Sequence, residues 1–168
     1  IAGACTRRFH GLLIAALPSP LGRIMMLNHL SEEIRLSDGR FVGLGCDDCS
    51  DIDITKSGPG ALSEFRLESG FPVWRFEVDG VVLEKSIVLP HLQNTVYVRY
   101  KLLKAPGMVR LRVRPSLHFR PHEGRVDLPL EHPYSVWAMA QRYEFRGERA
   151  IPPLRVLMHG SHGCMVLD

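Results

Sequence analysis

The sequence has few cysteines, no long apolar run and no sustained helical periodicity, and each absence narrows what the protein can be. Four unevenly spaced Cys in 168 residues do not make a disulfide framework, so we expect a reducing compartment, the cytoplasm. The longest early apolar run, Gly11 to Leu17, has the length of a strand and falls far short of the roughly 20 residues of a membrane span. Apolar residues do not recur at the helical spacing, and Pro and Gly interrupt most candidate helices. We therefore expect a soluble chain with few, short helices.

An excess of charge of one sign is also lacking. The net charge is +3 and the charged fraction 23%, and the basic residues alternate with apolar ones, as in Arg110, Arg112 and Arg114. A strand places such alternate residues on its solvent face, so we expect neither nucleic acid nor membrane as a partner. The sequence has no Gly-rich phosphate loop and no Gly-x-Ser-x-Gly elbow, which argues against a nucleotide cofactor and against serine hydrolase chemistry. We expect no cofactor.

What the sequence does contain is a series of strands with turn residues between them. Asp38-Gly39 and Asp79-Gly80 each separate runs in which apolar and charged residues alternate, and Asp-Gly favours the type I′ turn of a hairpin. The first hairpin is predicted from residues 33–36 and 41–42, and the second from residues 73–78 and 81–85. In both, one sheet face is expected to be buried and the other wet.

Further strands are predicted downstream. Residues 95–102 and 109–114, joined by Ala105-Pro106-Gly107, predict a meander, and residues 135–145 and 154–159 predict two more strands. The stretches 47–60 and 121–133 are rich in polar residues, Gly and Pro, and are predicted to be loops. Many antiparallel strands without helices between them indicate an all-β sandwich. We expect one such domain over residues 1–168, and because no Met begins it, a piece of a longer chain.

Several groups of Cys, Asp and His residues have side chains of the types that bind metal ions. Cys46 and Cys49 have the spacing of a metal or redox pair, but a zinc site needs a second pair, and a plain loop is favoured. An EF-hand register is missing from the acidic cluster, and the histidine pairs fall on a predicted turn and a strand end, so we expect no metal. The clusters are Asp47, Asp48, Asp51 and Asp53; His118 with His122; and His159 with His162.

Exposed aromatic rings beside polar groups are a common means of binding sugars, because a ring stacks on the apolar face of a pyranose. The candidates are Trp74, Trp137, Tyr134 and Tyr143. Aromatic residues in strands are more often part of the core, and period two alone does not say which face points inward.

A family resemblance enters with residues 6–17, Thr-Arg-Arg-Phe-His-Gly followed by an apolar run, and with Pro18, Pro20, Gly22 and Arg23. It continues through residues 64–67, 71–74, 83–85, 94–97 with Arg99 and Tyr100, and 111–115, and fades after about Phe119. On these residues the chain resembles the amino-terminal domain of bacterial and archaeal type glycogen-debranching enzymes, the amylo-α-1,6-glucosidases. Cys5 stands where the family more commonly has Asn, and Phe9 where it has Tyr.

The resemblance implies a β-sandwich like those in front of glucoamylase-like enzymes, of the galactose-mutarotase supersandwich type, packed against a carboxy-terminal (α/α)6 barrel. That barrel carries the acid and base carboxylates of hydrolysis, so this domain is expected to be non-catalytic and inactive alone. Its expected partners are the barrel and an α-glucan, either glycogen or a maltooligosaccharide. The residues expected to bind carbohydrate or the partner domain are Thr6, Arg7, Arg8, His10, Trp74 and Trp137.

Two alternative functions remain open at this point. One is a free-standing carbohydrate-binding module, which sugar titration of the isolated domain would favour. The other is a metal or redox domain that uses Cys46 and Cys49, which metal analysis of the purified protein would settle.

Overall fold

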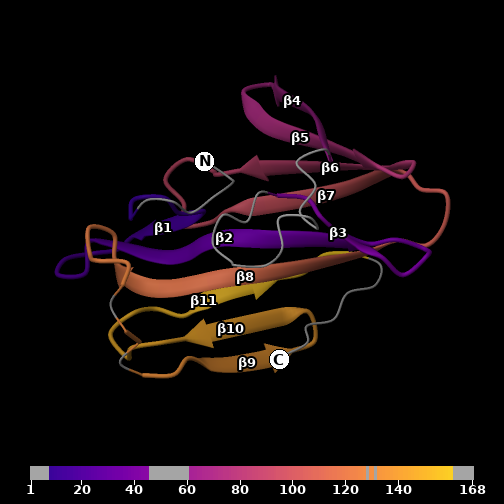
Figure 1. Cartoon of the computed structure of the whole chain (residues 1–168). Coiled ribbons are helices and arrows are strands. Elements are labelled where there is room, and N and C mark those ends of the chain that lie inside the picture. The colour runs from indigo at the N-terminus through magenta and orange to yellow at the C-terminus, as the bar shows by residue number, and fades with distance from the viewer. Residues whose placement is uncertain (1–7, 46–60, 128, 131, 161–168) are drawn as a thin grey trace.

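The computed structural model describes residues 8–45, 61–127, 129–130 and 132–160, and throughout these ranges regular structure consists of antiparallel strands (Figure 1). No helix occurs among the described residues, so neither the few short helices expected from the sequence nor any helix that could cross a membrane is found there. The strands are β1 (Leu13–Ala16), β2 (Arg23–Arg35), β3 (Phe41–Gly43), β4 (Leu62–Glu68), β5 (Phe71–Val78), β6 (Val81–Val88), β7 (Tyr97–Lys104), β8 (Arg110–Pro121), β9 (Ser135–Met139), β10 (Arg142–Arg146) and β11 (Leu154–Leu157).

The strands form three sheets. In the central sheet β2 pairs with β8 along most of its length and also with β1 and β3 near its two ends. A meander has the order β4-β5-β6-β7, and a three-strand sheet has the order β11-β10-β9. In Figure 1 the central sheet lies between the other two. The predicted all-β sandwich is therefore confirmed.

The burial of β2 shows how the layers are stacked. Four consecutive residues, Ile24 to Leu27, are all buried, which in a strand means that both faces are covered. Farther along, Glu32 and Ile34 are buried while Arg35 is exposed, so only one face is covered there. One apolar cluster accordingly takes buried residues from all three sheets, whereas a second takes them from the central sheet, the meander and the loops between them. Arg110, Arg112 and Arg114 are exposed on the wet face, as predicted.

The two Asp-Gly hairpins form with different turns. Asp79 and Gly80 have φ values of 48° and 77°, which confirms the type I′ turn between β5 and β6. The first hairpin forms between β2 and β3, but only Gly39 has a positive φ in its turn, at 91°. There the Asp38 carboxylate accepts the amide of Arg40 at 3.0 Å, which supports a longer turn spanning Leu36 to Arg40. The prediction of a type I′ turn between β2 and β3 was therefore wrong.

The chain changes sheets where the sequence predicted a continued meander. β7 pairs with β6, whereas β8 pairs with β2 in the central sheet. The connection between them, which begins with Ala105 and ends with Val109, packs both of these side chains against the second apolar cluster. The segment thus covers the end of the core while it crosses from one layer to the other, and the meander prediction was wrong at this step.

One strand predicted over residues 135–145 proves to be the hairpin of β9 and β10. Ala140 makes the turn with a φ of 54°, a conformation that alanine rarely adopts. No turn-forming residue marks this position, so the sequence did not reveal it.

A buried polar group joins the central sheet to the meander. Glu32 on β2 and Lys85 on β6 are each 6% exposed, and their side chains form an ion pair. The hydroxyl of Tyr100 on β7 donates a hydrogen bond to the same carboxylate. Burial, reinforced by the charge of Glu32, raises the pKa of Tyr100 well above its usual value, so the phenol remains a donor. These three residues connect the two layers in the middle of the core.

Candidate functional site

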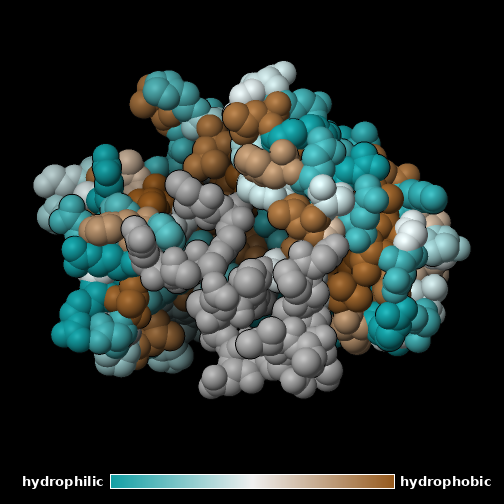
Figure 2. All heavy atoms as spheres, turned by 45° about the horizontal axis from the view of Figure 1, so that its top comes forward, coloured by the Kyte–Doolittle hydropathy of each residue, from teal (hydrophilic) through white to brown (hydrophobic). Residues whose placement is uncertain are grey.

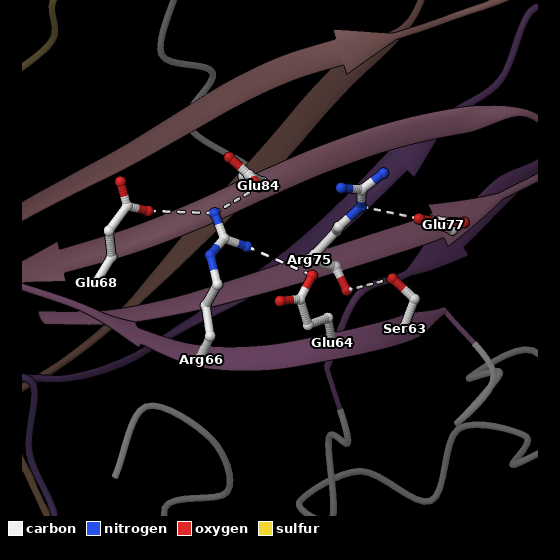
Figure 3. A network of polar contacts seen from close by, with 7 residues as sticks. All are labelled: Ser63, Glu64, Arg66, Glu68, Arg75, Glu77 and Glu84. Carbon is white, nitrogen blue, oxygen red and sulfur yellow. Dashed lines mark hydrogen bonds and ion pairs between the residues drawn. The ribbon is translucent and has the colours of Figure 1, made fainter.

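The acidic residues on the outer face of the meander are paired with arginines (Figure 3). Arg66 Nη2 lies 2.8 Å from Glu84 Oε1 and 3.2 Å from Glu68 Oε2, and its Nη1 lies 3.6 Å from Glu64 Oε2. Arg75 Nε lies 2.8 Å from Glu77 Oε1. The hydrogen bond that Arg66 donates to Glu84 raises the pKa of Arg66. These carboxylates are engaged by guanidiniums on an open strand face, an arrangement unlike the carboxyl pair on either side of a scissile bond that glycoside hydrolysis requires.

A small cavity lies where the two Asp-Gly turns meet, with a volume of about 160 Å³. Asp38 and Asp79 both line it, and Arg40 bridges them at 2.6 Å to each carboxylate. The backbone amide of Arg40, and then its side chain, lower the pKa of Asp38. A general acid needs the opposite shift. Arg40 therefore serves to tie two hairpins together, and the cavity is smaller than an ordinary ligand pocket of about 300 Å³ or more.

The outward face of the three-strand sheet carries the most exposed aromatic–polar surface that we find in the described residues. Trp137 on β9, Glu144 on β10 and Arg155 on β11 lie opposite one another in one row across the sheet. In the next row Arg142 lies between Met139 and Leu157. Trp137 is 73% exposed, Met139 72% and Leu157 61%. We call this surface, made of these six residues, the Trp137 face.

Glu144 organises the charges of the Trp137 face. Its carboxylate accepts hydrogen bonds from Arg142 at 2.6 Å, Arg155 at 3.0 Å and Arg146 at 3.0 Å. These hydrogen bonds lower the pKa of Glu144 to about 2. The carboxylate therefore remains ionised at neutral pH, and it fixes guanidiniums beside the exposed indole. Arg155 and Arg142 keep 58% and 44% of their side chains exposed, so further N–H groups can reach solvent or a ligand.

The low pKa of Glu144 predicts a pH dependence of stability. A carboxylate whose pKa is lower in the folded state stabilises the fold above its unfolded pKa, and that contribution is lost as the pH falls through the folded value. At neutral pH the free energy of unfolding should therefore be lower for Glu144→Gln than for the unaltered chain. This difference should shrink as the pH falls from about 4.5 to about 2. Urea unfolding at a series of pH values measures this difference. A deficit that stays constant across the window would contradict the prediction.

A second polar cluster anchors the segment before β1. Arg120 on β8 is only 4% exposed, and its Nη2 donates to the carbonyl of Arg8 at 2.6 Å. Its Nη1 donates to the carbonyls of Pro121, His122 and Gly124 at 3.1, 3.1 and 3.0 Å. One buried guanidinium thus holds both the amino-terminal segment and the turn that follows β8.

The side chains of this segment pack against each other and against that turn. The Arg8 guanidinium lies 4.5 Å above the centroid of the Phe9 ring, and the Phe9 and His122 rings are 5.3 Å apart. A Cβ on Gly11 would lie 2.3 Å from the sulfur of Met25, a side chain with no exposed surface, so only glycine fits there. Burial, followed by the charge of Arg120, lowers the pKa of the neighbouring His118.

The aromatic candidates divide between core and surface. Trp74 packs against both apolar clusters, and Tyr143 is a core residue, 7% exposed. The ring of Tyr134 packs against that of Phe119, and its hydroxyl oxygen accepts a hydrogen bond from the backbone amide of Phe119 at 2.8 Å. Trp137 alone of the four presents a freely accessible ring.

The residues expected to bind carbohydrate or the partner domain lie, where they are described, on separate parts of the fold. Arg8 and His10 precede β1, Trp74 lies on β5 in the meander, and Trp137 lies on β9 in the three-strand sheet. Thr6 and Arg7 lie outside the described residues. The described residues of this set are therefore not brought together: Trp137 belongs to the Trp137 face, and Arg8 and His10 to the segment before β1.

The metal-binding candidates lie partly outside the described residues. Cys46, Cys49, the acidic cluster of residues 47–53 and His162 lie outside the described residues. His122 Nε2 lies 3.3 Å from the Phe9 carbonyl oxygen. In the part of the chain that the structure describes, no group of three His, Cys, Asp or Glu side chains is arranged to hold a metal ion.

Two polar clusters of the structure, around Glu144 and around Arg120, were not predicted from the sequence. The cluster around Glu144 had a readable signal, since Arg142, Glu144 and Arg146 alternate along one strand and so share a face. Arg120 had none, because the Arg8 carbonyl is distant in the sequence and becomes a neighbour only through tertiary folding, and nothing in the local sequence shows that the carbonyls at 121–124 turn back toward the guanidinium.

Comparison with known families gives a match over nearly the whole chain. The family model described as "Glycogen debranching enzyme N terminal" matches residues 1–166. Neither a curated protein nor a solved structure shows significant similarity to the chain.

Proposed function

The chain belongs to the glycogen debranching enzyme N-terminal family, and from that premise we propose that it is a non-catalytic domain that packs against the catalytic barrel of the same polypeptide and contacts α-glucan. In this role the barrel supplies the acid and the base of α-1,6 hydrolysis, and the sandwich supplies a rigid support. The observation that carries the proposal is an apolar strand face, at the β4 edge of the meander, whose side chains are more than half exposed and are not covered by the other described strands.

The acids of the described residues support a non-catalytic role. Glycoside hydrolysis needs two carboxyl groups on either side of the scissile bond, one of them protonated. The buried Glu32 is engaged by Lys85 and Tyr100, and Glu144 is ionised beside its arginines. The remaining clustered acids, on the outer face of the meander and in the small cavity, are also paired with arginines.

The uncovered apolar face lies on β4. Phe65 stands opposite Trp74, which stands opposite Lys85, the residue that reaches the central sheet. This row therefore faces the core, and Leu67, two residues along β4, shares its side. Yet Phe65 is 56% and Leu67 66% exposed, because β4 and β5 extend beyond the central sheet at the top of Figure 1. Figure 2, which brings this region forward, shows brown apolar surface there among teal polar groups.

Apolar side chains on the core side of an edge strand are typical of a surface that a partner covers. The family to which the chain belongs is defined by a position in front of the rest of a debranching enzyme. The rest of that enzyme is thus the partner that we assign to this face.

The double variant Phe65→Ala/Leu67→Ala is expected to weaken association with the catalytic region at least about tenfold, since two large apolar side chains are lost from the contact. The measurement is co-expression of the chain with the polypeptide that follows it, then sedimentation or titration of the purified parts. Tyr97→Ala removes an aromatic side chain that is 59% exposed on β7, at the other edge of the meander, and should leave association unchanged. Equal affinity for the double variant and the unaltered chain would rule out this face.

A free-standing carbohydrate-binding module is the second candidate function, and the exposed Trp137 favours it. Its distinguishing result is tight glucan binding by the chain together with no affinity for the catalytic region. A metal or redox domain at Cys46 and Cys49 would instead be revealed by stoichiometric metal in the purified protein.

A further inference from the structure

We propose that the Trp137 face is an α-glucan-binding surface on which the indole of Trp137 stacks against a glucose ring while Arg142 and Arg155 donate hydrogen bonds to its hydroxyl groups. The choice of an α-linked glucan rests on the proposed function; the presence of a sugar-binding surface rests on the geometry of β9, β10 and β11.

The ring of Trp137 is available for stacking. The opposite face of the same sheet is the buried one, since Phe145 and Leu154 are 6% and 5% exposed in the core. Trp137 points the other way, 73% exposed, on a strand of which one edge is paired with β10. An indole in this position has no role in packing among the described residues, and it exposes an apolar surface that a pyranose can cover.

The hydrogen-bonding groups beside the ring are already ordered. Glu144 lies directly opposite Trp137 in the sheet register, with Arg155 next in the row. Because Glu144 holds the guanidiniums of Arg142 and Arg155 at 2.6 and 3.0 Å, less side-chain entropy is lost when they bind a ligand. Planar, fixed donors next to an apolar ring match a ligand that has hydroxyl groups on its rim and C–H groups on its face.

The shape of the surface indicates modest affinity. One exposed ring on a sheet face contacts about one or two glucose units, so binding by the chain alone should be weak, on the order of millimolar. Such a contact acts by avidity, because a glucan held here by the same polypeptide raises the local concentration of branches at the barrel.

The test is a titration of the chain with maltoheptaose, in which binding is measured by calorimetry and by tryptophan fluorescence. The only other tryptophan is Trp74, so Trp74→Phe isolates the signal of Trp137, whose emission should shift to shorter wavelength on binding. Trp137→Ala should weaken binding at least about tenfold, and Glu144→Gln, which releases the guanidiniums, about three- to fivefold. Tyr97→Ala, a matched loss of an exposed aromatic side chain, should bind as the unaltered chain does.

Three results would overturn the inference: equal binding by Trp137→Ala and the unaltered chain, stronger binding of cellohexaose than of maltoheptaose, or self-association of the chain that Trp137→Ala abolishes, which would make this face a protein interface. None of these three results depends on whether the chain associates with the catalytic region. A failure here and a failure of the Phe65 and Leu67 contact can therefore be told apart.

Discussion

Lys85→Met is expected to lower the free energy of unfolding by about 3–5 kcal/mol, because breaking a buried ion pair leaves an uncompensated charge in the core. Glu32 is 6% exposed and, among the described residues, would keep the hydroxyl of Tyr100 as its hydrogen-bond partner. Methionine is similar in length to lysine, so the expected loss comes from electrostatics and not from a cavity. Urea unfolding of the variant and the unaltered chain, with comparison of midpoints and slopes, measures it.

Two further variants test the cause of that loss. Lys101→Met removes an exposed lysine from β7 and should change the free energy of unfolding by less than about 0.5 kcal/mol. The triple variant Glu32→Met/Lys85→Met/Tyr100→Phe removes the whole polar group and should recover most of the loss, since well-packed apolar residues often replace a buried pair without cost. A triple variant no more stable than Lys85→Met would show that packing, and not the unpaired charge, causes the effect.

Lys85 also shows which features of the fold can be predicted from the sequence and which cannot. Alternation across Asp79-Gly80 predicted the hairpin correctly, because turn and register are local properties. The same alternation puts Lys85 on the apolar side, and the sequence did not show that a glutamate on a separate sheet would neutralise it there. Non-local pairing is what a single sequence specifies least, and the passage of the chain from β7 to β8 was mispredicted for the same reason.

The candidate site shows the same division between local and tertiary information. Trp74 and Trp137 both lie in strands in which apolar and polar residues alternate. This alternation alone does not predict which of the two indoles is buried and which is exposed. Trp74 is covered because the central sheet packs over β5, whereas Trp137 points away from the core. Which of the two indoles is exposed depends on how the sheets stack, and the sequence predicts a sandwich without predicting the order of its sheets.

Arg120→Met is expected to be nearly as destabilising as the loss of Lys85, on the order of 3–4 kcal/mol, since one buried guanidinium serves four carbonyl groups. Hydrogen bonds from a charged donor contribute about 1.5–3 kcal/mol each, although such bonds in one network are not additive. The variant should also release the segment around Arg8, which limited proteolysis detects as faster cleavage on the amino-terminal side of β1.

Controls for Arg120 come from the same strand and from lysine. Arg114→Met replaces an exposed arginine of β8, and it should affect neither stability nor proteolysis. Arg120→Lys retains the charge, but an ammonium cannot reproduce a planar group that donates through Nη2 to Arg8 and through Nη1 to the turn at 121–124. Intermediate stability with fast cleavage near Arg8 would follow if geometry matters more than charge, and full protection by lysine would contradict the anchoring role, because a charge alone would then be sufficient.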